Sequence, residues 1–120
     1  RRVLKPGGYA IVCTENLSSW HNIFALALGW QPFSLSNITD RRFQIGNPLA
    51  VHHGEAAKNP KSWQHHRVFS YRGLREVLEV HGFKVVRLEG SGYFPLPSGI
   101  AKLDPRHAAF LTAKVRKDKG

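Results

Sequence analysis

A carboxylate and a carboxamide, Glu15 and Asn16, directly follow an uncharged apolar run over 9–14. If that run is a strand, both side chains emerge at its carboxyl end, where ligands bind in open α/β sheets. Glu15 can orient a hydroxyl or an amine or take its proton, and Asn16 can hydrogen-bond the same group. The alternative is that one of the two residues only begins the following helix as a cap. Both interpretations stay open.

His65 and Arg67 form a second group of candidate residues. A histidine with a pKa near about 6.5 can serve as a base, and an arginine can hold a carboxylate or a phosphate of a substrate. The alternative is that both side chains pack between the preceding loop and the next helix. We favour that alternative for Arg67.

The adjacent pairs His52-His53 and His65-His66 suggest a metal site at first sight. Neighbouring side chains of an extended chain point in opposite directions, so such a pair rarely chelates one ion. No carboxylate or cysteine completes a recognisable ligand set, and we predict no metal. The one cysteine, Cys13, lies in the middle of the expected first strand, where we expect it to be a small buried hydrophobe.

The apolar stretch from Trp20 to Phe33 has three interpretations: a cover for the sheet, a lid over an apolar substrate, or an anchor at a membrane surface. Interfacial helices usually carry Lys or Arg on their polar face, and this stretch has neither. We therefore expect a cover or a lid, with Trp20 as a substrate-binding candidate. No uncharged stretch is apolar enough to cross a membrane.

Helical periodicity and capping residues predict two helices. One covers 20–28 after Ser18 or Ser19, and its nearly continuous apolar character predicts that it is buried. The other covers 71–81 after Ser70. A glycine follows each helix and can end it.

Three strands are expected, over 9–14, 84–88 and 108–115, and the first reads as buried on both faces. The order strand, helix, strand predicts a right-handed crossover and a parallel pair. No helix is expected after the second strand, so the last strand should return antiparallel, after a turn that includes the run Gly90-Ser91-Gly92. The predicted fold class is α/β, the terminal half of an open sheet with helices packed on it.

The segment 31–67 is irregular and rich in proline and glycine. Loops of this length are uncommon in compact domains and are often functional. Its aromatic residues argue against disorder. We therefore expect a variable loop or lid on the substrate side.

Three runs together carry a family resemblance. Residues 2–8 (RVLKPGG), followed by a strand, resemble the start of the fifth strand of class I S-adenosylmethionine-dependent methyltransferases of the type 11 and type 23 kind. Residues 65–70 (HHRVFS), with 81–83 (HGF) after the helix, resemble the His-x-Arg segment and the helix before the sixth strand. Residues 106–112 (RHAAFLT) resemble the antiparallel seventh strand. The likeness covers nearly the whole chain except 31–64.

The resemblance implies a fold, a cofactor and a compartment. Residues 1–120 would be the C-terminal part of one Rossmann-like domain, in the cytoplasm, with parallel strands and a final antiparallel strand. The glycine-rich loop and the acidic residue with which the family binds S-adenosylmethionine match no residue here, so both would lie upstream of Arg1. A sequence without methionine is consistent with a missing start. Alone, the chain should then bind the cofactor poorly, and the uncovered edge of its first strand should favour self-association.

The resemblance also assigns roles to residues. The chain would form the substrate side of the enzyme and contact a small-molecule methyl acceptor. Glu15 and His65 are the catalytic candidates, and Asn16, Trp20 and Arg67 are the substrate-binding candidates.

Charge supplies the rival interpretation. The chain has 18 Lys and Arg against 8 Asp and Glu, a net charge of +10, and such a basic body attracts polyanions. A nucleic-acid-binding or RNA-modifying module is therefore an alternative, although no basic recognition helix or aromatic-rich binding strand is visible. The third possibility is a degenerate methyltransferase fold without catalysis.

Overall fold

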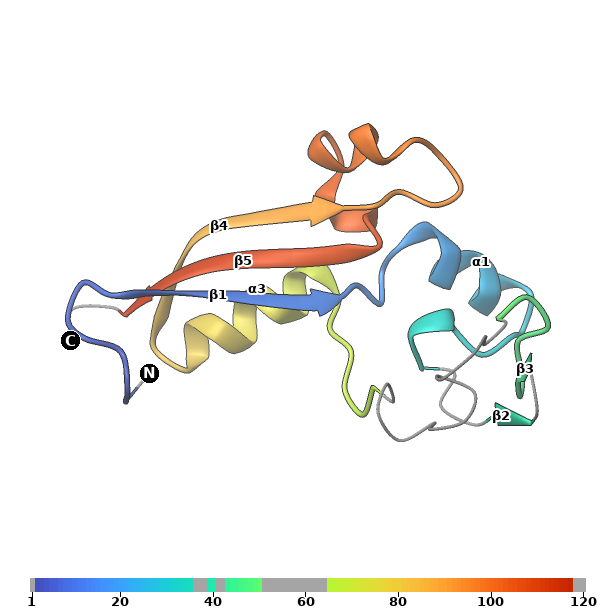
Figure 1. The fold of residues 1–120 in the computed structure, drawn as a ribbon, viewed down its shortest axis with the longest axis horizontal. Helices are drawn as coiled ribbons and strands as arrows, with labels where there is room; N and C mark the ends of the chain where they lie inside the picture. Colours follow the sequence, from blue (N-terminus) through green and yellow to red (C-terminus); the bar gives the residue numbers. More distant parts are fainter. Residues whose placement is uncertain (1, 36–38, 41–42, 51–64, 118–120) are drawn as a thin grey trace.

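The computed structural model describes residues 2–35, 39–40, 43–50 and 65–117. A three-stranded sheet forms its centre, and one helix lies along a face of that sheet (Figure 1). A second helix and several short elements gather beyond the end of the sheet (Figure 1). The candidate site residues lie at that end.

The strands of the sheet are β1 (Tyr9–Glu15), β4 (Phe83–Ser91) and β5 (Phe110–Lys117). Their order across the sheet is β1-β5-β4, and β5 is antiparallel to both neighbours. Ala113 shows the register, because it lies opposite Val12 of β1 on one side and opposite Leu88 of β4 on the other.

The prediction of a Rossmann-like sheet with parallel strands is wrong for this chain. β1 and β4 run in the same direction, but β5 lies between them, so every strand pair in the described residues is antiparallel. A helical crossover fixes the relative direction of the strands it joins but leaves open whether they are neighbours. The last strand occupies the space between them and makes the backbone hydrogen bonds of both ladders. The antiparallel return predicted for that last strand is correct.

β1 alternates between a covered and an exposed face. Ala10 and Val12 pack toward the main core, whereas Tyr9 and Ile11 are 59% and 54% exposed. Cys13 belongs to the exposed face as well. The predictions of a strand buried on both faces and of a buried Cys13 are therefore wrong, because helix packing covers only the face that carries Ala10 and Val12.

Helix α3 (Tyr71–Val80) follows the predicted local signals closely. The Ser70 hydroxyl accepts a hydrogen bond of 3.2 Å from the Gly73 N–H and caps the first turn. Gly82, at a φ of 78°, follows the helix in the left-handed conformation that ends it. Leu74 is 3% exposed and joins Leu88, Leu111, Ala113 and Val115 in the main core.

Helix α1 (Trp20–Ala27) begins after Ser19, as expected, and Gly29 at a φ of 74° turns the chain beyond it. Asn22 and Ala25 are its buried residues. Its opposite side stays open, with Phe24 and Leu26 more than half exposed. The expectation that this apolar helix buries itself is thus met on one side only.

Between β4 and β5 the chain forms two short 3-10 helices, η3 (Ser98–Lys102) and η4 (Pro105–His107). Gly90 lies inside β4, opposite Leu111, and not in a turn as predicted. A Cβ at this position would clash with Ala108 and lie 2.9 Å from Pro105 Cα. The glycine therefore permits close packing of η4 on the sheet, and the chain turns only afterwards, at Gly92 with a φ of 70°.

The segment 31–67, predicted as a loop or lid, is described in part. It contains a 3-10 helix, η1 (Phe33–Leu35), and a two-stranded ladder of β2 (Thr39–Asp40) and β3 (Phe43–Gln44). Residues 51–64, including His52-His53, lie outside the described residues. A lid remains a prediction. Within the described ranges, no helix has the length and apolarity that a membrane span requires.

Candidate functional site

The two residues proposed for catalysis from the sequence lie side by side. Glu15 Oε1 is 3.2 Å from His65 Nε2, and the two side chains are 27% and 44% exposed. The backbone explains the contact, since Asn16 and Phe69 form an isolated parallel bridge and the Leu17 N–H donates to the Phe69 carbonyl over 3.0 Å. This bridge places the segment that leads to α3 against the end of β1.

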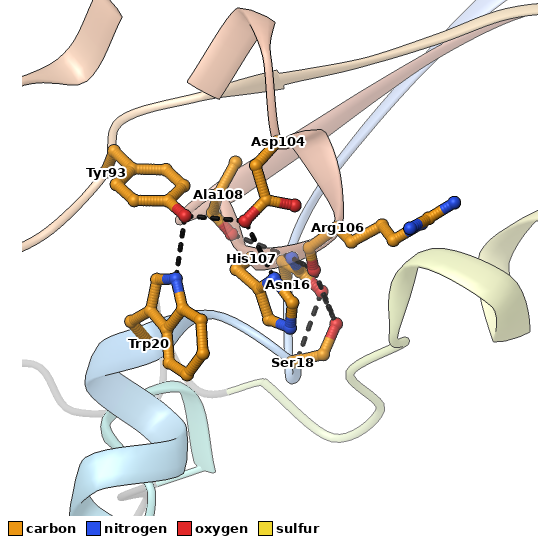
Figure 2. A network of polar contacts seen from close by, with 8 residues as sticks. All are labelled: Asn16, Ser18, Trp20, Tyr93, Asp104, Arg106, His107 and Ala108. Carbon is orange, nitrogen blue, oxygen red and sulfur yellow. Dashed lines mark hydrogen bonds and ion pairs between the residues drawn. The ribbon is translucent and has the colours of Figure 1, made fainter. Parts of the chain in front are cut away.

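The Asn16 side chain is buried and holds parts of the fold together, so it is not open to a substrate. It is fully buried, and its amide donates to the carbonyls of Arg106 and Ala108, each over 2.8 Å (Figure 2). Its Oδ1 accepts from the backbone N–H and the hydroxyl of Ser18. Two donors and two acceptor sites exhaust an asparagine amide. Asn16 thus holds the end of β1 to the segment before β5, and it has no hydrogen bond left for a substrate.

Trp20 is fixed by a network that the sequence did not reveal (Figure 2). Its Nε1 donates to the Tyr93 hydroxyl over 2.7 Å, and that hydroxyl donates to Asp104 Oδ2 over 2.5 Å. His107 Nδ1 lies 2.8 Å from the same carboxylate oxygen. The His107 ring also stacks on Trp20, with ring centroids 4.3 Å apart. The helix after β1 is thereby joined to the chain between β4 and β5.

The hydrogen bond between Tyr93 and Asp104 moves the pKa values of the two groups in opposite directions. The hydrogen bond from Tyr93, assisted by His107, lowers the pKa of the Asp104 carboxyl. The same bond raises the pKa of the Tyr93 hydroxyl. At neutral pH the carboxylate is therefore ionised and the phenol keeps its proton, so the direction of donation from Tyr93 to Asp104 is fixed.

An apolar pocket of about 560 Å³ adjoins Trp20. This volume is within the range of small-molecule sites. The lining is mostly aromatic and comes from α1, η1 and two further segments: Trp20, His21, Phe24, Phe33, Leu49, Phe94, Pro95 and Leu96. Trp20, the substrate-binding candidate of the apolar stretch, is one of the residues that line this pocket.

His21 is the titratable residue of the pocket lining. Its ring makes edge contacts with the rings of Phe33 and Phe94, at centroid distances of 5.3 and 6.0 Å. Burial lowers the pKa of His21, and the charge of Glu15 opposes that change in part. The effect of Glu15 means that its carboxylate lies within electrostatic reach of the pocket wall. At neutral pH the imidazole is uncharged.

The remaining sequence candidates take less central positions. Arg67 and His66 are exposed on the segment that leads to α3. Among the described residues, no group of three or more His, Cys, Asp or Glu side chains could hold a metal ion. Cys13 Sγ lies 3.5 Å from the Thr112 hydroxyl.

Sequence reasoning missed His21, Tyr93, Asp104 and His107. Tyr93 and Asp104 lie in a stretch that reads as a proline- and glycine-rich turn, and only its packing on α1 gives them a role. One signal could have pointed to His21: it is the lone histidine of a helix in which Asn22 is the only other polar residue.

Comparison with known proteins adds no family assignment. No family model matches the chain, and no curated protein and no solved structure is significantly similar to it.

Proposed function

We propose that this chain binds the acceptor of a methyl-transfer reaction, a small and largely apolar molecule, and removes its proton. The observation that carries the proposal is the contact between Glu15 and His65, where the charge of Glu15 acts on His21 in the lining of the apolar pocket. Both residues were chosen from the sequence for this chemistry, and they meet although they lie on separate segments. The sequence resemblance to S-adenosylmethionine-dependent methyltransferases supplies the reaction class.

The carboxylate of Glu15 accepts the proton of the acceptor hydroxyl or amine. His65 holds that carboxylate in position through Nε2, which lies 3.2 Å from Oε1. A positioned base of this kind contributes roughly 10²–10⁴-fold to a rate. The apolar wall formed by Trp20 and Phe24 orients the rest of the acceptor and excludes water from its reacting atom.

The cofactor is S-adenosylmethionine, which supplies an electrophilic methyl group when it is bound. The pocket beside Trp20 does not fit it. A nucleoside site usually places a carboxylate on the ribose hydroxyls, and the lining of this pocket contains neither Asp nor Glu. The proposal therefore assigns this pocket to the acceptor and not to the cofactor. We also propose the cytoplasm as the site of the reaction.

The test is transfer of a tritiated methyl group from S-adenosylmethionine to a panel of small phenols, amines and carboxylic acids. It uses the chain in its natural full-length context. We expect Glu15→Gln to lower kcat at least about tenfold. The matched control is Glu76→Gln, which removes an exposed carboxylate paired with Arg72 on α3 and should leave kcat unchanged. Full activity of Glu15→Gln would refute the assigned role, and transfer to no acceptor would refute the reaction class.

A nucleic-acid-binding module is the second candidate, favoured by the net charge of +10. Two of the exposed arginines, Arg72 and Arg87, are paired with glutamates, which reduces the charge available to a polyanion. RNA binding that weakens steeply as salt is raised would favour this candidate over the first.

A further inference from the structure

The pocket beside Trp20 is defined by aromatic rings and by very few polar atoms. Only Trp20 and His21 among its lining residues have polar side-chain atoms. The Trp20 N–H is already donated to Tyr93. One hydrogen-bonding side chain therefore remains to recognise a ligand, and it is His21.

The two nitrogens of His21 are in different surroundings. Nδ1 is buried and has no hydrogen-bond partner. A buried N–H without an acceptor is costly, so the neutral ring carries its proton on Nε2 and leaves Nδ1 as a bare acceptor. Since Nδ1 is covered, only Nε2 could reach a ligand. His21 can thus offer one N–H donor in an otherwise apolar lining.

We propose that this pocket binds an uncharged aromatic alcohol, of the phenol or naphthol class. Its ring packs against Trp20 and Phe94, and its oxygen accepts the hydrogen bond of His21 Nε2. This inference rests on the proposed function and deepens it, because it names the class of molecule that the pocket would hold as the methyl acceptor.

The composition of the lining excludes the nearest alternatives. The lining has no Lys or Arg to neutralise an anionic ligand and no Asp or Glu to neutralise a cationic one. Aromatic rings attract one another in edge or offset arrangements beyond the effect of buried area, which favours a flat ring over a saturated one. A dry cavity of about 150 Å³ holds benzene. The larger volume here suits a ligand of two or three rings.

The test compares three probes of similar size: 2-naphthol, naphthalene and the saturated alcohol 2-decalol. Binding to the chain is measured by calorimetry and by quenching of tryptophan fluorescence. We expect 2-naphthol to bind about two- to tenfold more tightly than naphthalene, because one hydrogen bond between uncharged groups has a net effect of about that size. We expect 2-decalol to bind more weakly than 2-naphthol by a similar factor. Equal binding of 2-decalol, or no binding of 2-naphthol to folded protein, would overturn the proposal.

Variants separate the contribution of His21 from that of the rings. In His21→Phe the preference for 2-naphthol over naphthalene should disappear while naphthalene still binds. The matched control, His81→Phe, changes an exposed histidine at the end of α3 and should keep the preference. If His21→Phe loses its folded circular dichroism spectrum, His21→Gln replaces it, because Gln retains a donor and should restore part of the preference. A preference unchanged in a folded His21→Phe protein would show that His21 is not the donor.

The two proposals can fail separately. Binding of 2-naphthol without methyl transfer would leave the pocket assignment standing and refute the reaction class. Methyl transfer to amines or carboxylic acids, with no binding of 2-naphthol, would refute the ligand class and leave the reaction standing.

Discussion

Trp20 and Tyr93 are joined by a hydrogen bond of 2.7 Å from the indole N–H to the phenol oxygen. Trp20 begins the helix that follows β1, and Tyr93 lies two residues beyond the end of β4. The same phenol donates to Asp104, so one hydroxyl joins three segments of the chain. The pocket wall formed by Trp20 therefore depends on residues far from it in the sequence.

Removing that hydroxyl should weaken both the fold and the pocket. Tyr93→Phe leaves the Trp20 N–H without its acceptor and Asp104 without its donor. Polar groups that lose their hydrogen-bond partner make the fold less stable. We expect a lower free energy of unfolding from urea titration, together with weaker binding of 2-naphthol. Tyr9→Phe, which removes an exposed hydroxyl, is the control and should change neither quantity. Equal stability of the two variants would show that the network contributes nothing.

Asn16→Ala should act on stability more than on chemistry. The substitution deprives the Ala108 carbonyl of its Asn16 donor, whereas the Arg106 carbonyl keeps the Ser18 hydroxyl as a donor. We expect the free energy of unfolding to fall by about 1–3 kcal/mol. His65→Ala, at a side chain that is 44% exposed, should leave the unfolding midpoint nearly unchanged while it lowers methyl transfer. A stable Asn16→Ala protein that has lost activity would instead support a direct contact with the substrate.

Stability should decrease as the pH falls below the ordinary pKa of histidine, in part because of His21. Burial lowers the folded-state pKa of His21 below 6.5. Between the two pKa values the unfolded chain binds a proton that the folded chain does not, so the free energy of unfolding falls as the pH falls through that window. Above pH 6.5 the effect of this group is absent. Glu15 is the charged group that opposes the lowered pKa of His21.

The measurement is the unfolding midpoint of the chain and of His21→Gln from pH 7.5 down to pH 5. The variant should lose less stability than the parent chain over this range. The matched variant His81→Gln, at an exposed position, should follow the parent curve. Parallel curves for all three proteins would contradict the prediction.

The open edge of β1 should promote self-association of the chain. β1 pairs with β5 along one edge, and among the described residues no strand pairs with its other edge. Its exposed face carries Tyr9 and Ile11, and apolar edge strands of this kind pair with other chains. We expect light scattering to detect oligomers of the parent chain and a shift toward monomer in Ile11→Lys. Val80→Lys adds the same charge at an exposed position of α3 and should leave the oligomers in place. A monomeric parent chain at all accessible concentrations would refute the prediction.

Local signals in the sequence were enough to predict the helices and the approximate strands. Ser70 and Gly82 set the two ends of α3 through contacts within one turn, and such contacts need no tertiary partner. Ser19 and Gly29 bracket α1 in the same way, although the Ser19 side chain makes no capping hydrogen bond. Glu15 could be chosen as a candidate because a polar residue that follows an apolar strand emerges at the end of a sheet.

The tertiary structure alone decided which strands are neighbours and which side chains meet. Apolar runs indicate that β1 and β4 are strands. The order β1-β5-β4 depends instead on the backbone N–H and C=O groups of β1 and β4 with which β5 pairs. The local sequence around Gly90 resembles a turn and therefore predicts one. In the structure Gly90 lies in a strand, and the close approach of Ala108 and Pro105 explains why the strand needs glycine there. The pairing of Glu15 with His65, and of Tyr93 with Asp104, depends on backbone contacts between distant segments. The sequence determines which residues can do chemistry, since that follows from side-chain type and local position. Their distances are decided by long-range packing, which no local pattern encodes.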